Sequence, residues 1–101
     1  MSTVKVVRYR TQPERADENA ALVRDVFAEL ATSEPDGLRY VTLRLEDGVS
    51  FVHVAVVEGG VNPLASSDAF TRFQSEIAQR CEEGPIALDA TVVGSFAFGL
   101  T

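Results

Sequence analysis

The sequence is poor in the residue types that build most metal and redox sites. Its 101 residues include one cysteine, one histidine, one methionine and no tryptophan. Cys81 cannot form a disulfide within the chain, and with a single histidine it cannot complete a structural zinc site. Gly59-Gly60 is too short for a phosphate cradle and is not followed by the lysine of a P-loop. We therefore expect no metal and no bound cofactor.

Basic residues are also scarce. Nine Lys and Arg against fifteen Asp and Glu give a formal net charge of −6. Phosphate-rich partners require clusters of basic residues, so the composition argues against binding to nucleic acid or to an anionic membrane. No apolar run approaches the roughly 20 residues that span a bilayer, and the first ten residues, MSTVKVVRYR, lack the layout of a signal peptide. We expect a cytoplasmic protein.

The length and the hydrophobic patterns predict one domain, residues 1–101. The β-branched segment TVKVVRYR predicts a first strand, and Thr11 and Glu14 have the spacing of a helix-capping box. Apolar residues at steps of three and four predict an amphipathic helix over residues 14–33. The same criterion predicts a second helix over residues 68–83, ended by Gly-Pro, and a last strand within residues 87–98.

The centre of the chain predicts a β-hairpin. Two strand-like runs, LRYVTLRLE and VSFVHVAVVE, are joined by Asp47-Gly48, a strong signal for a two-residue hairpin turn. That turn places Arg44 opposite Phe51 and Thr42 opposite His53. One face then mixes aromatic and polar groups, and the other is aliphatic.

The resulting order, β-α-β-β-α-β, predicts an α+β protein of the ferredoxin-like class, with a four-stranded antiparallel sheet and two helices on one face. The helices can cover only one side of the sheet, although both faces of the hairpin are apolar. An uncovered patch of a few hundred Å² is typical of a partner surface. We therefore expect a homodimer in which two sheets pack face to face.

The stretch FVHVAVVEGGVNPLASSDAFTRF resembles the strand, short loop and helix of the dimeric α+β-barrel proteins of the antibiotic biosynthesis monooxygenase type. Phe51 matches the family's strand phenylalanine, whereas Ala55 and Val57 stand where glutamate and tryptophan are usual, and the helix histidine of many members has no counterpart. The resemblance implies the dimeric ferredoxin-like fold over nearly the whole chain. It also implies oxygenation of aromatic compounds without a cofactor in the members that are enzymes.

His53 is the candidate catalytic residue, because histidine titrates near neutral pH and suits general acid or base work. In the oxygenase hypothesis it deprotonates a phenol in a cavity between helices and sheet. The expected ligand is a small apolar or aromatic molecule. The residues expected to line this cavity are Tyr40, Thr42, Phe51, Phe70, Phe73 and Gln74.

Other interpretations stay open at this stage. A lone histidine on a mostly apolar face is commonly a core residue whose ring nitrogens are hydrogen-bonded by neighbours such as Thr42. In that case the chain is a non-catalytic dimer with a filled core and no ligand. A regulatory domain that senses a small metabolite is a third alternative, since ferredoxin-like sheets carry many unrelated sites.

Overall fold

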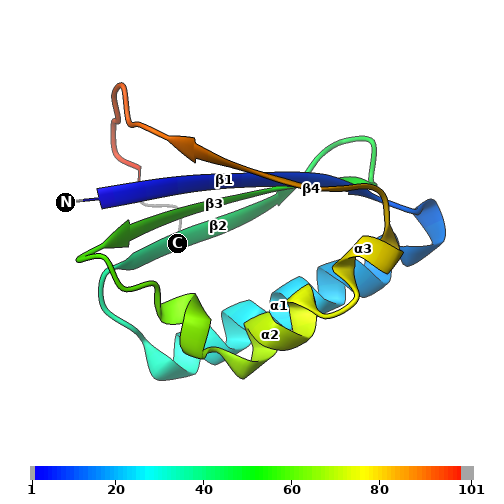
Figure 1. Ribbon diagram of the computed structural model, residues 1–101, viewed down its shortest axis with the longest axis horizontal. Helices are drawn as coiled ribbons and strands as arrows, with labels where there is room; N and C mark the ends of the chain where they lie inside the picture. Colours follow the sequence, from blue (N-terminus) through cyan, green and yellow to red (C-terminus); the bar gives the residue numbers. More distant parts are fainter. Residues whose placement is uncertain (1, 99–101) are drawn as a thin grey trace.

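The computed structural model describes residues 2–98, which form one antiparallel sheet with the helices gathered on one of its faces (Figure 1). The expected ferredoxin-like α+β fold is confirmed. The elements in chain order are β1 (Ser2–Thr11), the 3-10 turn η1 (Pro13–Arg15), α1 (Ala16–Ser33), β2 (Leu38–Arg44), β3 (Ser50–Glu58), the 3-10 turn η2 (Pro63–Ser66), α2 (Asp68–Gln74), α3 (Ile77–Arg80) and β4 (Cys81–Ala90).

The strand order is β2-β3-β1-β4, so β1 and β3 are central and β2 and β4 are the edges. Side chains alternate between the two faces of a strand. In β1 the helix-facing set includes Lys5, Val7 and Tyr9, which pair with Ala55, His53 and Phe51 of β3. The same alternation places Ala55, His53 and Phe51 on the helix side of β3, where all three are buried.

The predicted hairpin register is confirmed, with Arg44 opposite Phe51 and Thr42 opposite His53. The turn is longer than the two residues predicted, because regular strand ends at Arg44 and resumes at Ser50. The Asp47 carboxylate accounts for this. It accepts hydrogen bonds from the backbone N–H groups of Val49 and Ser50 and from the Ser50 hydroxyl, so these groups bond to the turn.

The predicted first helix is present, but its predicted cap is wrong. Thr11 is the last residue of β1, and both its backbone N–H and its hydroxyl donate to the carbonyl of Val49. The helical segment begins instead after Gln12, with Pro13 in its first turn, and the side chain of Gln12 makes no capping bond. A long-range bond to the hairpin therefore replaces the expected local cap.

The predicted second helix is wrong in its second half. It ends at Gln74, and Glu76 adopts a left-handed conformation with φ 63°. One more turn, α3, follows, and the chain is already extended at Cys81. The predicted last strand over residues 87–98 is therefore wrong in extent, because β4 runs from Cys81 to Ala90.

Gly84 and Pro85, predicted to end the helix, lie inside β4. Arg8 pairs with Ile86 and Arg10 with Glu83, so two residues of β4 stand opposite Tyr9 alone. This is a β-bulge, and it lies on an edge strand, where a proline costs no inter-strand hydrogen bond.

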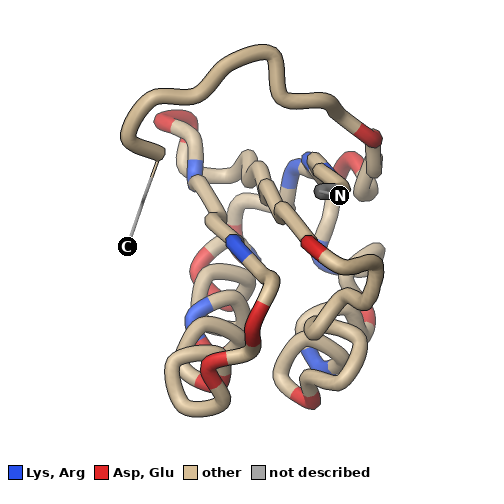
Figure 2. Tube along the Cα trace, turned by 90° about the vertical axis from the view of Figure 1, so that its left-hand side faces the viewer, with Lys and Arg blue, Asp and Glu red and all other residues tan. Residues whose placement is uncertain are grey.

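The sheet face away from the helices has no helix over it (Figure 1). Leu43, Ile86 and Leu88 on this side are 46%, 48% and 49% exposed. The segment after β4, residues 91–98, runs on this same side (Figures 1 and 2), and its Val93 and Phe96 are almost fully exposed. Acidic and basic residues are interspersed along the rest of the trace (Figure 2). Within residues 2–98 no helix is long and apolar enough to cross a membrane.

Candidate functional site

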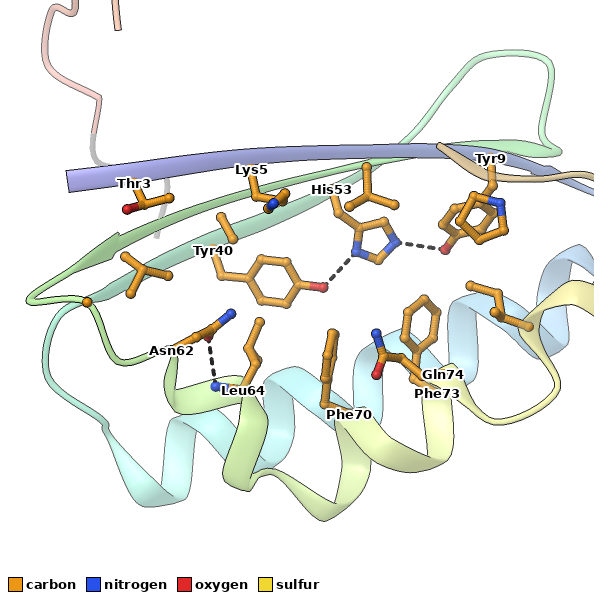
Figure 3. Close-up of a pocket in the computed structure, with 16 residues that line it drawn as sticks. Thr3, Lys5, Tyr9, Tyr40, His53, Asn62, Leu64, Phe70, Phe73 and Gln74 are labelled. Atoms are coloured by element: carbon orange, nitrogen blue, oxygen red, sulfur yellow. Dashed lines mark hydrogen bonds between the residues drawn. The ribbon is translucent and has the colours of Figure 1, made fainter. Parts of the chain in front are cut away.

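A cavity of about 520 Å³ lies between the sheet and the α2 and α3 helices. Its walls are mainly aliphatic and aromatic, and a few polar side chains enter from the strands, from α2 and from the loop before α2 (Figure 3). A volume of this size suits one small ring system. The residues that surround it include Val7, Tyr9, Tyr40, His53, Ala55, Val57, Leu64, Phe70, Phe73, Gln74 and Ile77.

His53 stands at the wall of this cavity with both ring nitrogens hydrogen-bonded. Nε2 lies 2.7 Å from the hydroxyl of Tyr9. Nδ1 lies 2.6 Å from the hydroxyl of Tyr40 and 3.0 Å from that of Thr42. The two tyrosines flank the imidazole along the cavity wall (Figure 3), and His53 itself is only 4% exposed. A ligand oxygen can therefore meet Tyr40 more readily than the imidazole.

The hydrogen bonds continue from Tyr9 into the helices. The side-chain amide of Asn19 on α1 donates to the Tyr9 hydroxyl at 2.8 Å. The Nε of Arg80 donates to the other end of the same amide, Oδ1, at 3.1 Å. We call the residues Arg80, Asn19, Tyr9, His53 and Tyr40 the polar chain. It joins α3, α1 and three strands of the sheet.

Arg80 is the charged end of the polar chain and is only 2% exposed. Its other nitrogens donate to the backbone carbonyls of Phe73 at 2.6 Å and Ser75 at 3.1 Å. None of the salt bridges among residues 2–98 includes Arg80, so carbonyl and amide oxygens solvate the guanidinium. These bonds also explain the end of α2, because Arg80 supplies the donors that the last carbonyl groups of a helix lack.

Burial changes the proton affinity of the site. Desolvation lowers the pKa of His53 to about 4, so the imidazole is neutral at pH 7. Desolvation raises the pKa of Tyr40 to about 12, against a smaller opposite effect of a hydrogen bond from Thr42. The pKa of Tyr9 is raised further by the same cause, partly offset by the hydrogen bond from Asn19. All three groups are uncharged at neutral pH.

Most of the residues predicted for the cavity are brought together. Tyr40, His53, Phe70, Phe73 and Gln74 line it. The ring of Phe73 lies 5.2 Å from the imidazole and 6.0 Å from the ring of Phe70. Gln74 is exposed, so it stands at the rim.

Two predicted residues lie behind the cavity wall. Thr42 does not line the cavity and reaches it only through its hydrogen bond to His53. Phe51 is fully buried and stacks on Tyr9, with ring centroids 5.5 Å apart. Its contribution is to support the tyrosine from the side away from the cavity.

Sequence reasoning missed three members of the polar chain. Tyr9 carries a usable signal, since strand alternation puts it on the same face as Val7. Asn19 carries another, because it shares the buried helix stripe of Ala16 and Val23. The sequence contains no signal for Arg80, because its burial depends on the break after α2, which the apolar spacing does not predict.

Cys81 and Ser67 have structural roles. Cys81 is the first residue of β4 rather than part of a helix, and burial raises the pKa of its thiol. Ser67 caps α2 by accepting a hydrogen bond from the N–H of Phe70. Among residues 2–98 no group of three or more His, Cys, Asp or Glu side chains could hold a metal ion.

The fold and the cavity define a ferredoxin-like α+β protein with an aromatic-lined cavity between sheet and helices. The sequence matches no protein-family model and no curated protein. Solved structures do match, and their fold is that of antibiotic biosynthesis monooxygenases, with TM-scores from 0.68 to 0.74. At sequence identities of 20% or less, this likeness concerns the fold.

Three of these structures illustrate the range. An antibiotic biosynthesis monooxygenase is 20% identical with a TM-score of 0.69, and the match covers 93% of this chain and 100% of that one. SnoaB from Streptomyces nogalater, a cofactor-independent oxygenase solved as a mutant, is 16% identical with a TM-score of 0.69, covering 95% and 97%. A dimeric ferredoxin-like protein of unknown function from Jannaschia sp. CCS1 is 14% identical with a TM-score of 0.68, covering 91% and 100%.

Proposed function

We propose that the protein binds a small aromatic molecule in the cavity between the sheet and α2, with one ligand oxygen at the hydroxyl of Tyr40. The observation that carries this proposal is the cavity itself, about 520 Å³ in a 101-residue chain, with the hydrogen-bonded hydroxyl of Tyr40 among a few polar groups in a mainly apolar wall. A filled core would leave no such space, since protein interiors are normally close-packed. Phe70 and Phe73 contribute aromatic rings to the cavity wall.

The reaction we propose to test is oxygenation of a phenol without a cofactor, by analogy with the oxygenase SnoaB of the same fold. A phenol that binds as its phenolate, with the proton released to water, has a ring electron-rich enough to react with dioxygen. One oxygen atom is added at a ring carbon, the other leaves as water, and all four electrons that reduce dioxygen come from the ring, which becomes a quinone. His53 would take part by holding the hydroxyl of Tyr40, which donates to the phenolate oxygen, because both nitrogens of His53 are already hydrogen-bonded.

Ligand-dependent melting tests the binding step. A panel of naphthols at about a hundred times the dissociation constant should stabilise the folded form by about 2.7 kcal/mol and raise Tm by several degrees. Ala55→Leu fills the cavity and should abolish the shift, whereas Ala21→Leu, on the exposed side of α1, makes the same chemical change and should keep it. A shift of equal size in both variants would refute the proposed site.

Oxygen consumption tests the chemistry. A naphthol that binds should be oxidised in the absence of added flavin or metal, and Tyr40→Phe should slow turnover because the ligand oxygen loses its partner. Binding without oxygen consumption would indicate a protein that binds a ligand but does not carry out this reaction, whereas absence of both would favour the non-catalytic dimer without a ligand. In the first case the cavity would still be functional.

We also propose that the protein forms a homodimer through the uncovered sheet face. The support is the row of apolar side chains on that face and the fold likeness to a protein described as a dimer. Leu43 and Leu88 come from the two edge strands, so the apolar surface spans the full width of the sheet. Packing against a second copy of the chain removes the apolar side chains of this face from water, and the same face on both copies gives a symmetric dimer.

Light scattering after size-exclusion chromatography tests the dimer. The native chain should elute with twice the mass of 10.9 kDa at micromolar concentration. Leu88→Lys places a charge on the uncovered face and should shift the protein toward monomer. Ala87→Lys places the same charge on the helix side of the same strand and should leave the dimer intact. A monomeric native chain would contradict the proposal.

A further inference from the structure

The polar chain has a direction, because an arginine side chain can only donate hydrogen bonds. Arg80 donates to Oδ1 of Asn19, so the NH₂ end of the same amide is the end that faces Tyr9. The oxygen of Tyr9 therefore accepts from Asn19. Its own hydroxyl hydrogen remains to be donated to another group.

That group is Nε2 of His53, 2.7 Å away. Among the hydrogen bonds of residues 2–98, the Tyr9 hydroxyl has only Asn19 and His53 as partners. A neutral imidazole has one N–H and one lone pair. If Nε2 carried the hydrogen, the hydroxyl of Tyr9 would be left buried without an acceptor, which is costly. Nε2 therefore accepts, and Nδ1 carries the hydrogen.

The direction continues to the cavity. The Nδ1–H of His53 points at the oxygen of Tyr40, at 2.6 Å, with Thr42 as a more distant second acceptor at 3.0 Å. Because the oxygen of Tyr40 accepts this hydrogen bond, its own hydrogen must point elsewhere. Tyr40 lines the cavity and Thr42 does not, so the cavity is the side on which the Tyr40 hydrogen is available.

We infer that Arg80 is a positioning residue that fixes His53 as the Nδ1–H tautomer through Asn19 and Tyr9, so that Tyr40 donates to a ligand with an acceptor oxygen. The ligand class is an aromatic ketone, quinone or phenolate. The choice of ligand rests on the proposed function, whereas the tautomer does not. Each donor in the polar chain also strengthens the next, and the first donor is a cation.

The substitution Asn19→Asp should reverse the direction of the hydrogen bonds from Tyr9 to Tyr40 while it keeps a side chain of the same size at position 19. The carboxylate still pairs with Arg80, but it cannot donate to Tyr9 and instead accepts the Tyr9 hydrogen. The oxygen of Tyr9 then needs a donor, which His53 supplies from Nε2. Nδ1 loses its hydrogen, and the hydroxyl of Tyr40 turns from the cavity to Nδ1.

Nitrogen-15 NMR reads the tautomer directly, because a ring nitrogen that bears hydrogen and one with a lone pair have separate chemical shifts. At pH 7, with no ligand, native His53 should show a protonated Nδ1 and a bare Nε2, and Asn19→Asp should exchange the two. Thr42→Val, which removes the more distant hydroxyl beside Nδ1, is the control and should keep the native pattern. A protonated Nε2 in the native protein, or no exchange in Asn19→Asp, would overturn the inference.

Two ligands of one shape test the donor at Tyr40. 2-Acetylnaphthalene offers a carbonyl oxygen, and 2-isopropenylnaphthalene replaces that oxygen by carbon. The native protein should bind the ketone roughly two- to tenfold more tightly, the range expected of one net hydrogen bond. Asn19→Asp should remove this preference while it still binds the hydrocarbon. Equal native affinities would overturn the ligand class, and failure of both compounds to bind would overturn the proposed function, with the tautomer decided separately by the NMR result.

Discussion

The burial of a neutral histidine makes folding stability depend on pH, and the structure gives the sign. The pKa of His53 is about 4 in the folded protein against an ordinary value of 6.5, because burial penalises the imidazolium. Between these values the unfolded chain binds a proton that the folded chain does not, so stability falls as pH falls through this window. The full shift corresponds to about 3 kcal/mol, of which about 1.5 kcal/mol should be lost between pH 6.5 and pH 5.

Urea unfolding at fixed protein concentration measures this loss, and His53→Gln is the matched variant. Glutamine keeps a hydrogen-bonding side chain but does not titrate, so its stability should change much less over the same pH range. Carboxylates with lowered pKa values, such as Asp47 at about 2, lose their stabilising effect below this window and do not mimic the result. Parallel curves for the native protein and His53→Gln would refute a buried neutral imidazole.

Three further predictions concern the framework of the site. Gly37→Ala should destabilise the protein by about 1 kcal/mol more than Gly48→Ala in urea unfolding, since both glycines have φ near 80° but only at Gly37 does an added Cβ approach a backbone oxygen, that of Glu58, at 3.0 Å. Phe73→Ala should cost about 3–5 kcal/mol in the same assay, because the ring is buried against the core. Asp47→Ala should lower Tm, because three hydrogen bonds to the turn are lost, and Asp47→Asn should lower it less.

Local signals predicted the part of the fold that local interactions determine. The hairpin register followed from Asp47-Gly48 because the pairing of two adjacent strands depends on the turn between them. The first helix followed from its apolar spacing. The break after Gln74 could not be predicted in this way, since it depends on Arg80, whose partner Asn19 lies 61 positions away in the sequence. A Gly-Pro pair is also ambiguous, because it suits a helix end and an edge-strand bulge equally well.

The candidate site also contains residues that local signals predicted and residues that depend on long-range contacts. His53 and Tyr40 were predicted because their strands are neighbours in the sequence as well as in the sheet. Tyr9 and Asn19 come from the first strand and the first helix, and only the folded chain brings Tyr9 to the imidazole and Asn19 to Tyr9. The aromatic wall was thus predictable. The sequence pattern could place Tyr9 and Asn19 on buried faces, but it could not predict the hydrogen bonds that connect them to His53.

The position of the polar chain gives a physical reason to connect it with the cavity. A buried cation and four buried or half-buried polar side chains cost desolvation free energy that apolar residues of the same volume would avoid. Every buried side-chain nitrogen and oxygen among the described residues nevertheless has a hydrogen-bond partner, so the chain is a complete network rather than a packing defect. It begins at the charge of Arg80 and ends at the hydroxyl of Tyr40, and its last three members, Tyr9, His53 and Tyr40, line the cavity. A network that served stability alone would have no reason to end at an open space, and this favours a role in holding a ligand oxygen.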